Sequence, residues 1–211
     1  MGIIMEIWLR NIPDFIVYSH MDNSLVKPKK FKPKKGFIPN IRIINVLLIN
    51  DYGQAVLFKR SEDNLYFPGH FHVLSGKLKE NENFRDCLIR EIYEETRIEV
   101  LKGDISEIGD IQYTKWDGKT WEMKPFDVLI HNSKIVLNGE HSEYVLVNPL
   151  ERGDLIVTPQ VEEMCRMYAK YLGVDKKGLR EIRKAKKEYE KGNYTTLRNR
   201  KEIEDYFESL K

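Results

Sequence analysis

The segment from Gly76 to Ile98 constrains the fold and chemistry of this chain more than any other part of it. It reads GKLKENENFRDCLIREIYEETRI. Five residues separate its first glycine from the next key acid, and seven more separate that acid from an Arg-Glu pair. The key positions of this segment are Gly76, Glu82, Arg90, Glu91, Glu94 and Glu95, together with apolar Ile92 and Ile98.

The second half of this segment has the pattern of an amphipathic helix. From Phe84 to Thr96, apolar residues recur every three or four positions, and neither proline nor glycine interrupts them. The apolar positions are Phe84, Cys87, Leu88 and Ile92. The spacing therefore predicts a helix over 84–96 that buries this face.

The acidic residues of the same helix are spaced to gather on one side. Glu91, Glu94 and Glu95 stand at i, i+3 and i+4, so their carboxylates share a helix face. Like charges at that distance raise one another's pKa unless a cation lies among them. Mg²⁺ prefers oxygen ligands and is commonly shared with substrate phosphates. The cluster therefore indicates a metal site for phosphate chemistry, whereas the alternative is a solvated charged helix face.

The whole segment resembles the Nudix box, the signature of the Nudix (MutT-like) hydrolases. That signature is G-x5-E-x7-R-E-U-x-E-E-x-G-U, where U is apolar, and the chain departs from it at one glycine. The resemblance implies an α/β fold, a Nudix-type α/β/α sandwich with a mixed sheet, over about residues 41 to 172. It also implies divalent-metal-dependent hydrolysis of a diphosphate bond in a nucleoside diphosphate linked to another moiety, with Mg²⁺ or Mn²⁺ as cofactor.

The resemblance assigns expected roles to individual positions. The expected metal ligands are Glu94, Glu95, Glu91, Gly76 (through its carbonyl) and Glu82 (through water, or by ordering the loop). Glu91 is expected either to bind metal or to act as the base near the attacking water. Arg90 is expected to orient Glu91 through a charge-assisted hydrogen bond.

Two positions of the box depart from the family pattern. Arg97 stands where the last glycine is usual, and Asn81 replaces a glycine within the loop. A left-handed conformation at Arg97 would cost about 1 kcal/mol, while Asn tolerates positive φ better than most residues. Neither change removes a carboxylate, so we expect activity to be retained.

Outside the box, Glu140 is the candidate for a further base or metal ligand, with Glu143 in reserve. Both could equally be solvated loop acids.

His70 and His72 flank the strand that leads into the box. They could contact a metal or phosphate, but we expect them to lie in a pocket wall or on the surface. The aromatic residues Tyr66, Phe67, Trp116 and Trp121 could stack on a base or form core. We therefore assign no substrate-binding residue from the sequence.

The remaining pattern predicts strands interspersed with helices. The expected strands cover residues 41–49, 54–59, 71–74, 105–116, 120–130 and 144–147, and an Asp117-Gly118 turn favours a hairpin. A further helix is expected to begin at Thr158-Pro159, because proline is favoured at the first helical position.

Two charged extensions flank this domain. We expect residues 1–40 to form an N-terminal extension, 41–172 the Nudix domain and 173–211 a helical C-terminal extension. The basic run Lys27 to Lys35 is expected to be extended, since each proline restricts the residue before it. It could bind the phosphates of nucleic acid or of a polyphosphate substrate, or serve as a solvated linker. The C-terminal part predicts two helices around Gly192-Asn193, which would pack on their own domain or form a homodimer.

The composition limits the kinds of partner and the cellular compartments that we expect for the protein. The net charge is +2 over 211 residues, so the total charge indicates no acidic partner. Cys87 and Cys165 lie on apolar helix faces and are expected to be small core residues, with no disulfide. The apolar start, Met1 to Leu9, contains Glu6 and lacks the features of a signal peptide. We expect no membrane span and a cytoplasmic location, with a nucleotide-type small molecule as substrate.

Two other functions stay open at this point. The first is hydrolysis of RNA ends or caps, which the basic run would serve. The second is a catalytically weak Nudix-fold ligand sensor or interaction module, for which Arg97 and the C-terminal extension are the support.

Overall fold

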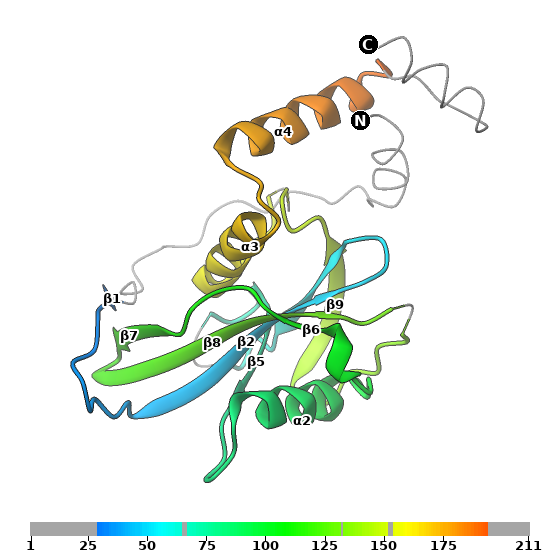
Figure 1. The fold of residues 1–211 in the computed structure, drawn as a ribbon. Helices are drawn as coiled ribbons and strands as arrows, with labels where there is room; N and C mark the ends of the chain where they lie inside the picture. Colours follow the sequence, from blue (N-terminus) through cyan, green and yellow to red (C-terminus); the bar gives the residue numbers. More distant parts are fainter. Residues whose placement is uncertain (1–28, 65–66, 132, 152–153, 194–211) are drawn as a thin grey trace. The chain divides into compact units, whose positions relative to one another are not determined.

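The computed structural model describes residues 29–193, apart from 65–66, 132 and 152–153. Among the described residues, those up to Gly173 and those from Val174 onward belong to two different compact units. The larger unit holds the whole β-sheet and two helices (Figure 1).

A single mixed sheet of nine strands forms the centre of the larger unit, within the part of the chain that the structure describes. Its strands are β1 (Lys29–Lys30), β2 (Ile41–Ile49), β3 (Ala55–Arg60), β4 (Phe71–His72), β5 (Leu74–Lys77), β6 (Ile105–Glu107), β7 (Gln112–Trp116), β8 (Lys119–Leu129) and β9 (His141–Val147). The main path runs β1-β7-β8-β2-β3-β4, with β5 on β2, β6 on β8 and β9 on β3. The β2–β8 pair is parallel and the other pairs are antiparallel.

Strand β2 is buried on both faces, which explains its nearly continuous apolar sequence. Because successive side chains of a strand point to opposite faces, β2 contributes to both hydrophobic clusters of the unit. Ile44, Val46 and Leu48 belong to one cluster. Leu47 and Ile49 belong to the other. Polar Asn45 is also buried, and it lies on the second face.

The two helices of this unit cover opposite faces of the sheet. Helix α2 (Phe84–Thr96) begins at Asn83, whose side chain accepts hydrogen bonds from the first-turn amides, and it buries Cys87, Leu88 and Ile92 in the first cluster. Helix α3 (Pro159–Tyr171) buries Val161, Met164 and Tyr168 in the second cluster. The predicted α/β/α sandwich with a mixed sheet is therefore confirmed, as are both helix starts (Figure 1).

Two of the predicted strands are in fact interrupted. The expected strand 105–116 is two strands, β6 and β7, which pair with different parts of β8. The break faces Pro125, which has no N–H to offer a neighbouring strand. The expected strand 71–74 also divides, because β4 pairs with β3 while β5 pairs with β2.

The described part of the basic run is attached to the sheet. Lys29 and Lys30 pair with β7, and the Phe31 amide donates to the Tyr113 carbonyl at 3.1 Å. The Phe31 ring packs against Phe37 and Tyr113, with ring centroids 5.3 and 6.2 Å away. The extended conformation is thus confirmed at Lys29 and Lys30, whose side chains are exposed to solvent. Lys35 instead lies in a turn, and both the phosphate-binding role and the linker role of the run stay predictions. Residues 27 and 28 lie outside the described part.

The second unit contributes helix α4 (Lys176–Glu190), which confirms the first of the two expected C-terminal helices. The Asp175 side chain accepts a hydrogen bond from the Gly178 amide and so caps its start. The second expected helix, after Gly192, lies outside the described residues.

Two expectations from composition can be compared with the structure. Cys87 is buried in the first cluster and Cys165 is half-buried against the second, so both pack in the core as expected. No helix within residues 29–193, where described, has the length and apolar character needed to cross a membrane. The cytoplasmic location and the homodimer stay predictions.

Candidate active site

The box loop and helix α2 contain the two left-handed residues that the sequence suggested. Asn81 has a φ of 62° and Arg97 a φ of 60°. Arg97 ends α2, and its amide donates to the Tyr93 carbonyl at 3.0 Å. Its guanidinium lies 5.4 Å from the centre of the Tyr93 ring. The helix therefore ends as it would with the usual glycine, and the ring contact offsets part of the strain.

Arg90 connects the box loop to the acidic face of α2. It donates to both oxygens of Glu82, at 2.8 and 2.9 Å, and it also contacts Glu91 at 2.8 Å and Glu94 at 3.0 Å. Two further contacts are to the Lys77 carbonyl at 3.1 Å and the Cys87 Sγ at 3.5 Å. The Lys79 amide also donates to Glu82. The hydrogen bonds from Arg90 lower the pKa of Glu82 to about 2. Glu82 is therefore a fixed anion that holds the loop against the helix.

Glu91 lies between Arg90 and the strand that leads into the box. Its side chain packs so closely on Gly76 that a Cβ at position 76 would be 2.1 Å from the Glu91 Cγ. Burial raises the pKa of Glu91, and the charges of Glu94 and Glu140 raise it further, while Arg90 opposes both effects. Glu91 thus combines a fixed position with a higher than ordinary proton affinity.

Glu95 is the most deeply buried carboxylate of the cluster, with 4% of its surface exposed. Its Oε2 lies 2.7 Å from His141 Nε2, and the His141 Nδ1 lies 3.4 Å from His72 Nε2. The His141 ring stacks on Phe58, with centroids 4.9 Å apart. Burial raises the pKa of Glu95, and the bond to His141 opposes this effect. The sequence did not reveal His141, because it approaches Glu95 from a strand 46 residues away.

Glu140 shares a cavity with this pair, and Glu143 does not. A cavity of about 360 Å³ is lined by Glu95, Glu140 and His141, among others. Glu143 instead forms an ion pair with Lys59 at 3.0 Å. The structure therefore brings Glu140 to the box carboxylates and leaves Glu143 outside the group.

The donor set of this site suits a hard divalent cation. The charge of Glu140 raises the pKa of both Glu91 and Glu95, and the charge of Glu91 also raises the pKa of Glu95. A cation among them would relieve that repulsion, and their oxygens are the donors that Mg²⁺ and Mn²⁺ accept. Across the described residues, no group of three or more His, Cys, Asp or Glu side chains is already arranged around a metal position.

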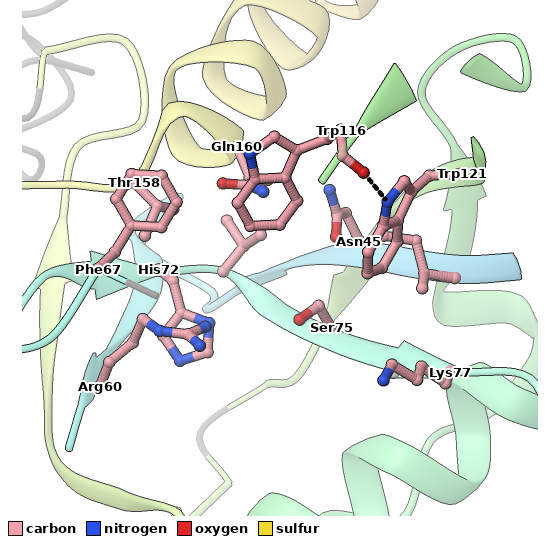
Figure 2. Close-up of a pocket in the computed structure, with 13 residues that line it drawn as sticks. Asn45, Arg60, Phe67, His72, Ser75, Lys77, Trp116, Trp121, Thr158 and Gln160 are labelled. Atoms are coloured by element: carbon pink, nitrogen blue, oxygen red, sulfur yellow. Dashed lines mark hydrogen bonds between the residues drawn. The ribbon is translucent and has the colours of Figure 1, made fainter. Parts of the chain in front are cut away.

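A second cavity, of about 260 Å³, adjoins the first (Figure 2). Three aromatic residues line it, namely Phe67 from the loop before β4, Trp116 from β7 and Trp121 from β8. Trp116 stacks on Phe67, with centroids 6.3 Å apart, and lies 5.9 Å from Trp121. Tyr66, the fourth aromatic candidate, lies outside the described residues.

Three side chains line both cavities, namely Arg60, His72 and Ser75. Burial lowers the pKa of His72 to about 3, with smaller effects from His141 and Arg60, so His72 is neutral at physiological pH. Arg60 supplies the positive charge at the junction, and it donates to Asn64 at 2.6 Å. The expected place of His72 in a pocket wall is confirmed, whereas His70 lies outside both cavities and contacts the Pro68 carbonyl.

Comparison with known proteins agrees with this geometry. The model of the NUDIX domain matches residues 39–168 of the chain. The chain belongs to the Nudix family. It is a Nudix hydrolase, an enzyme of the pyrophosphohydrolase class.

Several relatives support the assignment. Nucleoside triphosphatase NudI of Escherichia coli K12 is 29% identical over 116 residues, which cover 51% of this Nudix hydrolase and 82% of NudI. The crystal structure of a MutT protein from Methanosarcina mazei Go1 is similar at a TM-score of 0.54 and 26% identity, covering 63% of this chain and 94% of that one. The NUDIX domain of Shewanella oneidensis NrtR, solved with ADP ribose, shares the fold at a TM-score of 0.54 and 14% identity, over 67% and 94% of the two chains.

Proposed function

We propose that this Nudix hydrolase cleaves a diphosphate bond in a nucleoside diphosphate linked to another group, and that it requires a divalent metal. Nucleoside triphosphates belong to this class, and the resemblance to NudI favours them. The main support for the proposal is that the two cavities share three lining residues, Arg60, His72 and Ser75. Together the cavities offer an aromatic surface for a base, a cationic passage for phosphates and an acidic site for the bond to be broken.

The metal would be held by the acidic face of α2 and the strand before it. We assign Glu94, Glu95 and the Gly76 carbonyl as ligands of Mg²⁺ or Mn²⁺, and Glu91 either as a further ligand or as the base. When bound, such a metal neutralises phosphoryl oxygens and acidifies a bound water. Glu82 has both oxygens engaged by Arg90, so we assign it to ordering the loop.

Proton transfer would fall to two carboxylates near the metal ligands. Glu91 suits this role, because a general base works best when its pKa approaches the working pH, and its pKa is raised. Arg90 holds the Glu91 Oε1 at 2.8 Å and so fixes the direction of the carboxylate. Glu140 lines the cavity beside Glu95 and would act as a second proton acceptor.

The phosphates would be bound at the junction. The Arg60 guanidinium is half-buried there, where a charge-assisted hydrogen bond to a phosphate is stronger than in water. Neutral His72 and the Ser75 hydroxyl add hydrogen bonds without adding charge.

A hydrolysis screen tests this function. Purified protein is incubated with nucleoside triphosphates, ADP-ribose, dinucleoside polyphosphates, nucleotide sugars and capped RNA, with Mg²⁺ or Mn²⁺, and products are identified by mass. Glu95→Gln serves as the blank, and Glu143→Gln as the matched control, because Glu143 lies outside the cavity. We expect products from wild type and Glu143→Gln but none from Glu95→Gln. Absence of products across the panel, from folded protein, would refute the proposal.

A further inference from the structure

The aromatic cavity has a polar wall whose acceptors are unused. Asn45 is 1% exposed in the middle of β2, opposite Ser75, and its Oδ1 has no hydrogen-bond partner within the described structure. An asparagine in a strand of otherwise mostly apolar residues is itself an anomaly. Figure 2 shows its amide among the side chains that line the cavity.

The start of α3 contributes two more such groups. Thr158 is the N-cap residue and is 1% exposed, yet its hydroxyl caps no amide of the helix, and its Oγ1 is unpartnered. Gln160, two residues later, lines the same cavity. Like the Thr158 hydroxyl, its Oε1 has no hydrogen-bond partner among the described residues.

Leaving buried acceptors unpaired is costly. Each costs about 1–3 kcal/mol, and native proteins contain only a few. Of the five unpartnered buried side-chain atoms found among the described residues, three belong to residues that line this one cavity: Asn45 Oδ1, Thr158 Oγ1 and Gln160 Oε1. The amide oxygens of Asn45 and Gln160 only accept, so a ligand that satisfies both must bring hydrogen-bond donors, whereas the Thr158 hydroxyl can accept or donate.

The aromatic residues of the same cavity favour a flat ligand. Phe67, Trp116 and Trp121 offer aromatic faces on which a base can stack. Phe67 also has a φ of 55°, a left-handed conformation that is costly for an aromatic residue and that concentrates at ligand sites. The cavity volume of about 260 Å³ lies just below the range of about 300–1,000 Å³ typical of ligand pockets. That volume suits a base, with the rest of a nucleotide outside.

We propose that this cavity binds the base of the nucleotide substrate, and that Asn45, Thr158 and Gln160 select a base with adjacent N–H donors. Guanine has this edge, formed by its ring N1–H and its exocyclic 2-amino group. Adenine and cytosine place a ring acceptor beside their amino group, and uracil places carbonyls on both sides of its one N–H. Because the proposal concerns the substrate of the same site, it rests on the proposed function.

The phosphates of a guanine nucleotide bound in this way have a defined exit. Arg60, His72 and Ser75 join the base cavity to the cavity of Glu95 and Glu140. The base and the reacting phosphates therefore lie in different cavities, and the base contacts can be changed without touching the carboxylates.

The test compares GTP with ITP, which differs only by lacking the 2-amino group. We expect kcat/KM to be at least tenfold higher for GTP in the wild-type protein. Asn45→Leu should bring this ratio close to one, while Asn45→Asp, which keeps an acceptor oxygen, should retain most of it. Thr158→Val is a second variant for the same test, should Asn45→Leu fail to fold.

Gln112→Leu is the matched control. Gln112 is also a half-buried amide with an unpartnered Oε1, but it does not line the cavity, so its loss should leave the GTP/ITP ratio unchanged. A wild-type ratio near one would overturn the proposal. So would a ratio that stays unchanged in both Asn45→Leu and Thr158→Val.

A binding measurement separates this proposal from the function on which it rests. In Glu95→Gln protein, quenching of tryptophan fluorescence by GMP and by IMP reports the base cavity without turnover. Tighter binding of GMP would support the base assignment even if no substrate were hydrolysed. Equal affinities would refute it even if hydrolysis were rapid.

Discussion

Glu91 packs directly on Gly76, so that a Cβ at residue 76 would lie 2.1 Å from its Cγ. Gly76 is not among the glycines with positive φ, so its backbone conformation does not require glycine. The absence of a side chain is needed instead to admit the Glu91 carboxylate between the strand and α2. The spacing between the first glycine and the Arg-Glu pair of the box thus has a direct steric reason.

Gly76→Ala should therefore displace Glu91 and lower turnover by about 100-fold, since a shift of about 1 Å in a catalytic group has that order of effect. Gly103→Ala is the control, because a Cβ there meets nothing within 4 Å. Steady-state rates and thermal unfolding of both variants make the check. Equal activity in Gly76→Ala and wild type would show that Glu91 has no catalytic part.

Arg97→Gly should stabilise the protein. A left-handed Arg costs about 1 kcal/mol that Gly does not, and the lost contact with the Tyr93 ring offsets part of this gain. Urea unfolding should show a higher midpoint for Arg97→Gly and a lower one for Arg97→Ala, which keeps the strain but removes the contact. A midpoint for Arg97→Gly below that of wild type would mean that the ring contact outweighs the strain.

His141→Phe should weaken metal binding by about 10- to 100-fold, the usual effect of losing a group that orients a ligand. Phenylalanine can preserve stacking on Phe58 but cannot donate to Glu95. Mn²⁺ titration followed by electron paramagnetic resonance measures the affinity directly. His131→Phe, at an exposed site away from both cavities, should leave it unchanged. Unchanged Mn²⁺ affinity in His141→Phe would remove Glu95 from the ligand set.

Glu82→Gln should lower the free energy of unfolding at neutral pH. The variant should also lose less of this free energy than wild type when the pH falls. The folded-state pKa of Glu82 is lowered from 4.5 to about 2, because Arg90 stabilises the carboxylate. The stabilisation is therefore fully present above about pH 4.5 and is lost as the pH falls towards 2. Urea unfolding between pH 7 and pH 2 measures the difference, with exposed Glu80→Gln as the control. Parallel curves for Glu82→Gln and wild type would contradict the role given to Arg90.

Phe31→Ala should destabilise the larger unit and lower turnover on all substrates to the same extent, because Phe31 packs on Phe37 and Tyr113. Replacing the exposed Lys32, Lys34 and Lys35 by Gln should leave stability unchanged. A loss restricted to RNA substrates in the lysine variant would instead favour the RNA-end function.

The local features of this chain could be predicted because their causes are local. The bounds of β2 and α2 follow from apolar periodicity, and the left-handed Asn81 and Arg97 from their places in the box. The breaks at Val73 and around Gly109 could not be predicted, because they depend on which strand pairs with which.

The parts of the site that were missed come from distant segments. His141 meets Glu95 only because β9 pairs with β3, and no periodic pattern encodes that contact. Asn45 could have been identified as a candidate from the sequence, because a polar residue inside an apolar strand is expected to be buried and to need a hydrogen-bond partner. Thr158 was recognised as the start of a helix, but its unused hydroxyl is visible only in the folded structure.

The central claim is that the box carboxylates support metal-dependent cleavage of a diphosphate bond. Phosphorus-31 NMR of GTP incubated with the protein tests it most directly, with Mg²⁺ present or removed by EDTA, in wild type and Glu95→Gln. The account predicts that product phosphate signals appear only with wild type and Mg²⁺. The same signals at the same rate in Glu95→Gln, or after removal of the metal, would contradict it.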